Sequence, residues 1–185
     1  MAIHVRYKIP VFWNNEYKDL DYIHEEFNDQ KSLDQWRQQG YAGSFTGFMC
    51  DMRSAQPSWN DKFIKIYQDQ GWSDIGTSYY RMDTGTVLPT HSDLYLKYVK
   101  IHNLQGREQS IRRAIVFLED WEPGHYSETD GIGLVNWSAG TTIEWAYDTP
   151  HAAANLGLKP RYTLQITGDR KSTRLNSSHV AFLVC

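Results

Sequence analysis

The sequence has few cysteines, no long hydrophobic run and no cluster of basic residues. Only two of its 185 residues are cysteines, Cys50 and Cys185, which excludes a framework of several disulfides. No apolar stretch approaches the length that crosses a bilayer, and the N-terminal residues lack the apolar core of a signal peptide. The formal net charge is −3 and the basic residues are scattered, which disfavours nucleic acid and anionic membranes as partners. We therefore expect an intracellular, cytoplasmic protein.

What the chain does have is the composition of one soluble domain rich in aromatic residues. Hydrophobic residues make up 41% and charged residues 22%, and a length of 185 residues suits one ordinary domain with a proper core. Aromatic residues make up 14%, and broad flat side chains pack well on pleated sheets. The composition therefore favours a β-rich domain.

The C-terminal segment differs in character from the rest of the chain. Residues 169–179 read DRKSTRLNSSH, which resembles the translation of a widely used sequencing-adapter DNA. Segments of such origin are set apart from reasoning about the fold. We therefore predict one domain over residues 1–168 and a non-native tail over residues 169–185. The domain then holds Cys50 alone, which suits a reducing compartment.

Two helices are expected in the N-terminal third. Ser32 and Gln35 have the spacing of a capping box, and the segment 33–39 is followed by Gly40, so a short helix is predicted there. A second helix is expected over residues 59–70, which carry an apolar stripe at helical spacing. We expect these helices to support a β-sheet.

Most of the chain consists of short β-type runs separated by turn residues. Regularly spaced strands of this kind are typical of an all-β sandwich or barrel. The sequence shows no internal repeat, low-complexity tract or domain linker. The predicted strands cover residues 2–9, 75–82, 94–101, 112–120, 133–137, 141–145, 151–155 and 161–168.

A His-x-Asp pair and a distant histidine carry the candidate metal chemistry. His91 and Asp93 lie two residues apart, so on an extended strand both side chains leave the same face. His151 begins another predicted strand. Two histidines and one carboxylate on one face of a β-scaffold form the facial triad that holds ferrous iron and leaves coordination positions open. We therefore predict that these three residues bind iron(II) and form the catalytic centre.

An arginine that follows His151 is predicted to bind a dianionic co-substrate. The turn over residues 156–160 should place His151 and Arg161 on adjacent antiparallel strands. A dianion that chelates the iron would put its far carboxylate deep in the barrel, where an unpaired charge is unfavourable. Arg161 supplies a planar, permanently charged partner, and Thr163 points the same way and adds a hydroxyl donor.

Together these residues resemble the signature of the 2-oxoglutarate and iron(II)-dependent oxygenases. The spacing His151-x3-Asn155-x5-Arg161 is similar to the aspartyl/asparaginyl β-hydroxylase-like branch, and the resemblance covers residues 79–168. Some members of that branch lack the carboxylate ligand, whereas Asp93 is present here. The metal site therefore more nearly resembles those of the free-amino-acid and prolyl hydroxylases.

The resemblance implies a fold, a set of cofactors and a reaction. The implied fold is a double-stranded β-helix, the cupin-like jelly-roll, supported by a few N-terminal helices. Iron(II) is the implied cofactor, 2-oxoglutarate and dioxygen are the co-substrates, and Arg161 pairs with the far carboxylate of 2-oxoglutarate. The expected reaction hydroxylates an amino-acid side chain, free or within a polypeptide, with release of succinate and CO2. The protein's part is to place the reacting bond and to exclude water.

Several further residues have two interpretations. Asn155 either lines the site as a co-substrate contact or holds the following turn through its side chain. Either Arg112 or Arg113 is expected to project inward and contact co-substrate or substrate, and we favour Arg113. His102 and His125 lie in loop-like contexts without partners at ligand spacing, which favours solvated histidines over ligands. Trp145 is expected in the core, near the site.

Two other classes of function stay open at this point. A metal-dependent cupin-type enzyme that does not use 2-oxoglutarate would not need Arg161 and would recruit further histidines, and none lies at suitable spacing. A non-catalytic jelly-roll binding module would leave His91, Asp93 and His151 scattered over the surface. The two alternatives therefore differ from the oxygenase in where these side chains lie.

Overall fold

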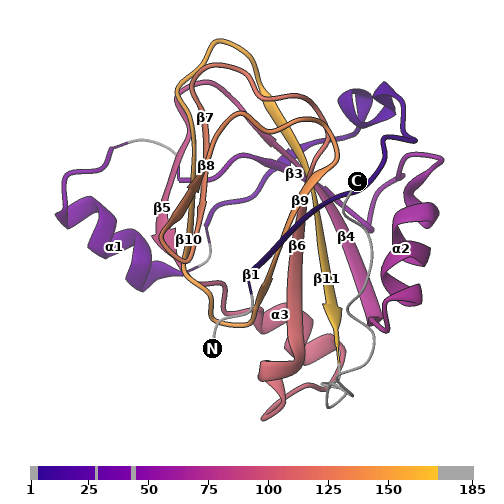
Figure 1. The fold of residues 1–185 in the computed structure, drawn as a ribbon. Helices are drawn as coiled ribbons and strands as arrows, with labels where there is room; N and C mark the ends of the chain where they lie inside the picture. Colours follow the sequence, from indigo (N-terminus) through magenta and orange to yellow (C-terminus); the bar gives the residue numbers. More distant parts are fainter. Residues whose placement is uncertain (1–3, 28, 43–44, 171–185) are drawn as a thin grey trace.

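Two antiparallel β-sheets pack against each other in the computed structural model, which describes residues 4–27, 29–42 and 45–170. Figure 1 shows the two sheets side by side. The larger sheet contains, in spatial order, β1 (His4–Lys8), β9 (Thr141–Ala146), β6 (Ile111–Phe117), β11 (Arg161–Asp169), β4 (Ser73–Met82), β3 (Phe48–Asp51) and β2 (Ile23–His24). The smaller sheet contains β5 (Val87–His91), β10 (His151–Asn155), β7 (His125–Thr129) and β8 (Ile132–Leu134).

Three α-helices lie around the sheets within the described ranges (Figure 1). Helix α1 (Gln30–Gln38) lies beside β5, α2 (Asn60–Asp69) covers the outer face of the larger sheet, and α3 (Leu96–Ile101) lies near one end of β6. Short 3-10 helices span Asn15–Asp19 and Glu108–Ser110. No helix in the described part of the chain is long and apolar enough to cross a membrane.

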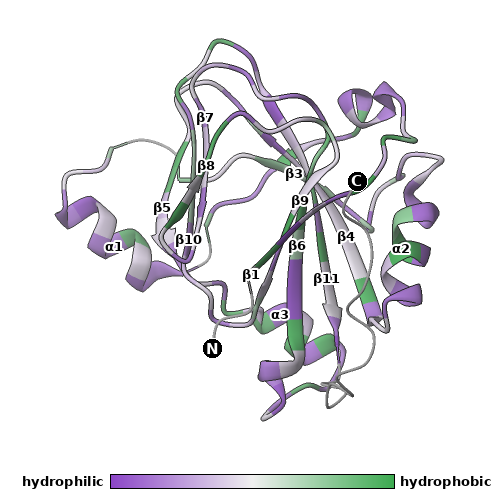
Figure 2. Cartoon of the chain, viewed as in Figure 1, coloured by the Kyte–Doolittle hydropathy of each residue, from purple (hydrophilic) through white to green (hydrophobic). Residues whose placement is uncertain are grey.

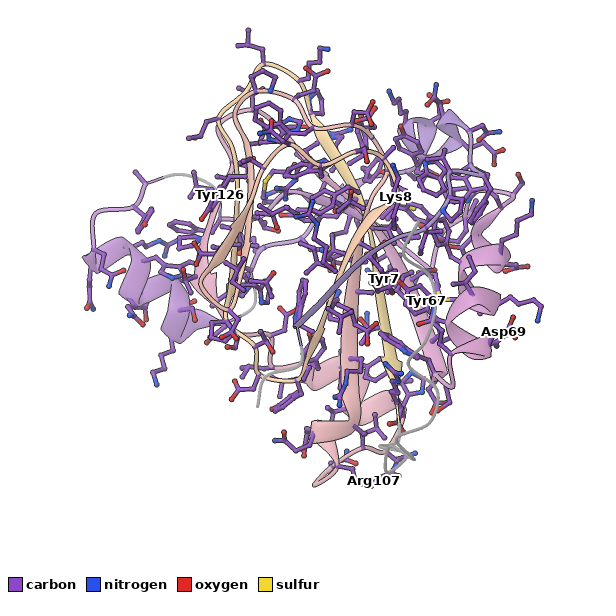
Figure 3. The ribbon with its side chains drawn as sticks, in the orientation of Figure 1. Tyr7, Lys8, Tyr67, Asp69, Arg107 and Tyr126 are labelled. Atoms are coloured by element: carbon purple, nitrogen blue, oxygen red, sulfur yellow. The ribbon has the colours of Figure 1, made fainter. Side chains whose placement is uncertain are left out.

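The outer face of the larger sheet carries the main hydrophobic core. Leu164 and Ile166 of β11 are fully buried and belong to one cluster with Phe63 and Tyr67 of α2. Burial of each such side chain stabilises the fold by about 1.5–3 kcal/mol. The Tyr7 hydroxyl of β1 donates to the Tyr67 hydroxyl at 2.9 Å, and both residues are labelled in Figure 3. Helix α2 therefore supports the sheet, as the sequence predicts.

The inner face of the larger sheet, which looks toward the smaller sheet, is partly polar. Because side chains alternate along a strand, Arg161, Thr163 and Gln165 of β11 point inward while Leu164 points outward. Figure 2 shows that β6 carries a purple, hydrophilic segment between green, hydrophobic ones. A second hydrophobic cluster fills part of this interior and comprises Phe117, Leu134, Trp137, Ile143 and Trp145. Buried polar groups need partners, so the polar part of the interior is where a ligand would be held.

One predicted strand is a helix. The segment 94–101 is rich in β-type residues, but it contains α3. Tyr95, Tyr98 and Val99 have helical spacing, and they pack in one cluster with Ile111 at the start of β6. The strand prediction was wrong. The apolar residues of this segment form a stripe on one side of a helix, and that stripe packs against Ile111.

The smaller sheet contains a strand that the sequence does not reveal. Strand β7 reads HYSET, and its polar residues lack the alternation of apolar and polar side chains by which a strand is recognised. His125, its first residue, is only 3% exposed, and its Nε2 lies 2.9 Å from the backbone oxygen of Lys159. The prediction that His125 is a solvated loop histidine was therefore wrong.

The predicted non-native tail lies mostly outside the described residues, which end at 170. Its first residue, Asp169, is the last residue of β11 and pairs with Ile111 of β6 and Ser73 of β4. Arg170 donates from its backbone N–H to Ser110, and its Nη1 lies 3.0 Å from Glu144 Oε1. These two residues are thus packed on the sheet.

Candidate metal centre

His91 is the last residue of β5, and its ring is held in one orientation. Its Nδ1 lies 2.8 Å from the backbone oxygen of Pro89, so Nδ1 carries the proton and Nε2 keeps a free lone pair. The rings of Phe27 and Trp36 meet the imidazole edge-on, at centroid distances of 5.0 and 5.8 Å. The imidazole is therefore buried, oriented and ready to act as a ligand through Nε2.

His151 is the first residue of β10 and lies directly opposite His91 in the register of β10 and β5. Its Nδ1 lies 3.0 Å from the backbone oxygen of Thr149, which leaves Nε2 free in the same way. The two imidazole centroids are 4.3 Å apart, and the Trp145 ring packs against His151 at 4.9 Å. The two histidines therefore point their free nitrogens into one space.

Asp93 completes the group from outside the strand. Strand β5 ends at His91, so the expectation that both side chains leave one extended strand was wrong. Asp93 Oδ1 lies 3.8 Å from His91 Nε2, and Oδ2 lies 3.8 Å from His151 Nε2. One ligand atom from each of the three residues lies within 4.8 Å of the others. The structure thus brings the three predicted ligands together in a geometry that can hold one metal ion.

The protonation states of this group suit a divalent cation. Burial, reinforced by the neighbouring His151, lowers the pKa of His91 to about 4, so its imidazole is neutral. Burial of Asp93 would raise its pKa, but Arg113, the two histidines and the Tyr95 hydroxyl outweigh that effect and lower it. At neutral pH the site therefore offers a neutral imidazole at His91 and an ionised carboxylate, the forms that bind metals.

His151 and Arg161 do not lie on adjacent strands, contrary to the prediction. Strand β10 lies between β5 and β7 of the smaller sheet, whereas β11 lies between β6 and β4 of the larger sheet. The turn over residues 156–160 therefore crosses from one sheet to the other. The two residues approach the interior from opposite walls.

Arg161 is a buried cation without an anionic partner among the described residues. It is 6% exposed, its Nη1 donates to the backbone oxygen of Tyr126 at 2.5 Å, and its Nε has no hydrogen-bond partner within residues 4–27, 29–42 and 45–170. Burial lowers its pKa to about 10, and no carboxylate among the described residues offsets this shift. A buried guanidinium is normally paired with a carboxylate. The interior of the protein thus contains a buried positive charge that an anionic group would neutralise.

The strand register gives the approximate distance between the Arg161 guanidinium and the candidate metal ligands. Tyr126 pairs with Ala154 and Thr129 pairs with His151, so three strand positions separate the Arg161 contact from the metal-binding end. Three positions correspond to about 10 Å along a strand. This separation suits a short dicarboxylate that reaches from a metal ion to Arg161.

Two other predicted site residues, Thr163 and Arg113, lie on strands of the larger sheet. Thr163 is buried two residues after Arg161 on the same face of β11. Arg113 Nη2 lies 3.3 Å from Asp93 Oδ2, and Nη1 donates to Gln165 Oε1 at 2.7 Å, while Nε has no hydrogen-bond partner in the part of the chain that the structure describes. Its contact with co-substrate stays a prediction.

The side-chain amide of Asn155 forms hydrogen bonds with backbone groups. Its Nδ2 donates to the backbone oxygens of Met82 and Lys159, each at 2.8 Å, and its Oδ1 accepts from the Gly157 N–H at 3.0 Å. These bonds use both amide protons and the oxygen. Asn155 therefore fixes the turn between β10 and β11, and its assignment to cofactor binding was wrong.

The sequence analysis did not identify two residues that lie near the candidate ligands. Thr129 is 1% exposed and shares the face of His151, and in the described part of the chain its Oγ1 has no hydrogen-bond partner. Tyr95 has a left-handed backbone, with φ 51°, and its ring lies 5.1 Å from the guanidinium carbon of Arg113. The position of Tyr95 two residues after Asp93 is the only signal that the sequence offers, because the backbone angle is a tertiary feature.

Comparisons with known proteins show what this fold is similar to. No protein-family model matches the chain, and no curated protein matches it. A prolyl 4-hydroxylase from Pseudomonas putida is similar over 76% of this chain and 83% of that chain, with 14% identity and a TM-score of 0.52. The fold is a jelly-roll. This likeness confirms the predicted double-stranded β-helix.

Two other solved structures are less similar. A prolyl 4-hydroxylase from Phytophthora capsici matches 83% of this chain and 57% of that chain, with 13% identity and a TM-score of 0.47. A cupin protein from Bacteroides fragilis matches 60% of this chain and 79% of that chain, with 14% identity and a TM-score of 0.38.

Proposed function

We infer that this protein is a 2-oxoglutarate- and iron(II)-dependent dioxygenase that hydroxylates an amino-acid side chain, free or within a polypeptide. The observation that carries the inference is the combination of two features in one interior. His91, Asp93 and His151 converge as ligands, and Arg161 is buried with no anionic partner in the described chain. A metal site alone fits many reactions, but the unpaired guanidinium calls for a co-substrate with a free carboxylate.

The three converging residues fit an iron(II) ion. Two imidazole nitrogens and one carboxylate oxygen make the facial set that iron(II) oxygenases use, and both Nδ1 atoms are fixed by backbone carbonyls. When bound, the ion supplies the one-electron and dioxygen chemistry that amino-acid side chains lack. The rings of Phe27, Trp36 and Trp145 pack on the imidazoles, and only 3% of the His91 side chain and 12% of the His151 side chain are exposed.

Arg161 and Thr163 would hold the far carboxylate of 2-oxoglutarate. The guanidinium is already fixed by its bond to Tyr126, and its free Nε can donate to an incoming oxygen. The overall reaction is balanced: one oxygen atom of dioxygen enters the substrate C–H bond as a hydroxyl, and the other enters succinate as CO2 leaves. The chain's contribution is to bind, orient and shield the reactants.

The arrangement favours this function over the two alternatives. A non-catalytic binding module gives no reason for three ligand-type side chains to converge, and here they do. A cupin-type metal enzyme without 2-oxoglutarate gives no reason for a buried, unpaired Arg161. In addition, His102 and His125 lie outside the candidate ligand group of the described residues.

The test is the formation of the iron and 2-oxoglutarate chelate without oxygen. Iron(II) is added anaerobically to the metal-free protein, 2-oxoglutarate is titrated in, and the weak visible charge-transfer band of the chelate is followed. We expect the band in the wild type and a loss of 2-oxoglutarate affinity of at least 100-fold in Arg161→Ala, because a charged hydrogen-bonded pair is lost. Arg107→Ala, at an exposed arginine labelled in Figure 3, is the matched control.

Each outcome of this titration contradicts a different part of the proposed function. No band in a wild type that binds iron would rule out 2-oxoglutarate as co-substrate. Equal affinity in wild type and Arg161→Ala would show that Arg161 does not hold the carboxylate. A succinate assay over free amino acids and peptides then identifies the substrate.

A further inference from the structure

Three large apolar side chains are exposed in the segment that directly follows Asp93. They belong to Leu94, Leu96 and Ile101, whose exposed fractions are 47%, 68% and 60%. A single exposed apolar side chain is ordinary on a protein surface, whereas a contiguous group of them marks an interaction site. All three lie within eight residues of a candidate metal ligand, so their arrangement bears on what approaches the metal centre.

Two of these residues lie on one side of α3 together with two lysines. Successive residues of an α-helix are about 100° apart around its axis, so the exposed residues of α3 share one arc of about 140°. They are Leu96, Lys97, Lys100 and Ile101. Val99 is buried on the other side of the helix. The four exposed residues thus form a continuous surface, the α3 face, in which two lysines lie between two apolar side chains.

Contacts on the buried side of the helix hold the α3 face in place. Val99 packs in one cluster with Leu104 and with Ile111, at the start of β6. The Tyr98 hydroxyl donates to the backbone oxygen of Asp74 at 2.8 Å. Figure 1 accordingly shows α3 near one end of β6. The exposed side chains therefore project from a helix that is packed on the sheet.

The α3 face begins close to the candidate metal ligands. Leu96 follows Asp93 by three residues, so their Cα atoms are at most about 11 Å apart. The six residues of α3 add about 9 Å along the helix axis. An extended polypeptide advances about 3.3 Å per residue, so one that reaches the metal centre spans the α3 face within about six residues. A free amino acid is too short to contact both.

Lys97 and Lys100 are cations without an ion-pair partner among the described residues. Asp51 interacts with Lys97 at longer range, but both oxygens of Asp51 accept from Arg53 Nε, each at 2.8 Å. The formal net charge of the whole chain is −3, so this positive surface is opposite in sign to the protein that carries it. Carboxylates of a partner would complement the two lysines, and apolar side chains of the same partner would cover the rest of the α3 face.

We propose that the α3 face is the docking surface for a polypeptide substrate that carries apolar and acidic residues within about six positions of the residue that reacts. This inference rests on the proposed function, and within that function it selects a polypeptide over a free amino acid. Carboxylates of the substrate pair with the two lysines, and its apolar side chains cover Leu96 and Ile101. Two lysines without further basic or aromatic residues do not form a nucleic-acid footprint.

The first test compares peptides that differ only in charge. Fluorescein-labelled peptides of about 13 residues extend six residues to either side of a random central position. Three pools share the same apolar residues, and their remaining positions are glutamate, glutamine or lysine. Fluorescence anisotropy is measured on the full chain under nitrogen, with iron(II) and 2-oxoglutarate present. We expect the wild type to bind the glutamate pool about tenfold more tightly than the glutamine pool, and the lysine pool most weakly.

Charge reversal on two helices shows whether the lysines of the α3 face cause this preference. Lys97→Glu/Lys100→Glu reverses two charges three residues apart. Lys62→Glu/Lys65→Glu makes the same change at the same spacing on the exposed side of α2, and it is the matched control. We expect the α3 variant to lose the preference for the glutamate pool and the α2 variant to keep it.

The apolar part of the α3 face is tested in the same way. Leu96→Ser/Ile101→Ser removes its two apolar side chains. Leu156→Ser/Leu158→Ser is the matched control, because these leucines are 70% and 95% exposed in the turn between β10 and β11. We expect about a tenfold loss of affinity for the glutamate pool in the first variant and no loss in the second.

Succinate release shows whether the docked polypeptide is the substrate. When oxygen is admitted, the glutamate pool should raise succinate release by the wild type above the level without peptide. Mass spectrometry should then find one added oxygen atom in the peptides. Lys97→Glu/Lys100→Glu should raise the KM for this pool about tenfold and leave the KM for 2-oxoglutarate unchanged. Peptide binding without added oxygen, in a protein that forms the iron and 2-oxoglutarate chelate, would overturn the proposal.

The remaining outcomes are equally decisive. Equal binding of the three pools by the wild type would overturn the proposal, and this comparison needs no substitution. An equal loss of affinity in the α2 and α3 variants would do the same. Binding to vesicles of anionic lipid, with no preference among the pools, would assign the α3 face to a membrane instead. A wild type that prefers the glutamate pool but forms no chelate would contradict the proposed function and leave the docking surface standing.

Discussion

Arg161 starts on the larger sheet and reaches the smaller one, where its Nη1 donates to the backbone oxygen of Tyr126 at 2.5 Å. This bond links the two walls of the jelly-roll through a cation that has no anionic partner among the described residues. A buried, uncompensated charge is unfavourable for folding. The proposed role of Arg161 in ligand binding accounts for this charge, and it leads to a prediction about stability.

Replacing Arg161 by methionine should stabilise the ligand-free protein. Methionine keeps much of the side-chain volume and removes the desolvated charge, although it leaves the Tyr126 carbonyl without its donor. We expect a net gain of roughly 1 kcal/mol in the free energy of unfolding, or a few degrees in Tm. The measurement is thermal unfolding of the metal-free protein.

Added 2-oxoglutarate should make the wild type more stable than Arg161→Met. With iron(II) present and oxygen excluded, saturating 2-oxoglutarate should raise the Tm of the wild type and leave that of Arg161→Met unchanged. A methionine variant less stable than the wild type without ligand would show that Arg161 has a structural role that outweighs its desolvation.

Asp93 and Arg113 should be coupled in the metal-free protein. Asp93→Ala leaves Arg113 without a carboxylate, and we expect a loss of about 1–2 kcal/mol, because the pair is only partly buried. The double variant Asp93→Ala/Arg113→Met should recover part of this loss. Urea unfolding of the four proteins gives the coupling energy. Strictly additive losses would mean that the ion pair contributes nothing to the fold.

Asn155→Ala should weaken the fold without changing the affinity for 2-oxoglutarate. The substitution removes two donors and one acceptor that serve buried backbone groups of Met82, Lys159 and Gly157, and we expect a loss of about 3 kcal/mol. Unfolding and anaerobic 2-oxoglutarate titration are measured on the same preparation. A folded variant with unchanged stability and a much lower 2-oxoglutarate affinity would restore the cofactor-binding role.

His125 should make the protein less stable in mild acid. Burial lowers its pKa below the ordinary value of 6.5, and the nearby charge of Arg161 acts in the same direction. Between the lowered pKa and 6.5 the unfolded chain therefore binds more protons than the folded chain. The free energy of unfolding then decreases as the pH falls below 6.5.

The variant His125→Gln isolates this contribution. Glutamine keeps an N–H donor for the Lys159 carbonyl but does not titrate. Urea unfolding between pH 7 and 5 should show a shallower pH dependence in the variant than in the wild type, and the His91 contribution cancels in the comparison. Identical slopes would show that His125 takes up its proton equally well in both states.

Local patterns in the sequence were enough to predict much of the fold. The apolar stripe over residues 59–70 predicted α2, and the runs 75–82, 151–155 and 161–168 predicted β4, β10 and β11 to within two residues at each end. These segments carry the hydrophobic periodicity that the core requires. The predictions failed where the periodicity is weak or ambiguous, as in β7 and in the segment 94–101.

The chemical types at the candidate site were also visible in the sequence, but their arrangement was not. The spacing of His91 and Asp93 and the distant His151 pointed to a metal centre, although Asp93 reaches it from a loop and not from the strand. Asn155 had two interpretations, and only the positions of Met82 and Lys159 decided between them.

The sequence by itself determined the ligand types, the β-rich class of the fold and the helix that supports it, because these depend on residue chemistry and on periods of a few residues. Only the tertiary structure decided that His151 and Arg161 face the interior from different sheets, that Arg161 lacks a counterion among the described residues, and that Asp93 is held by Arg113. These relationships join positions far apart in the chain. They arise from how the two sheets pack, which no local pattern specifies.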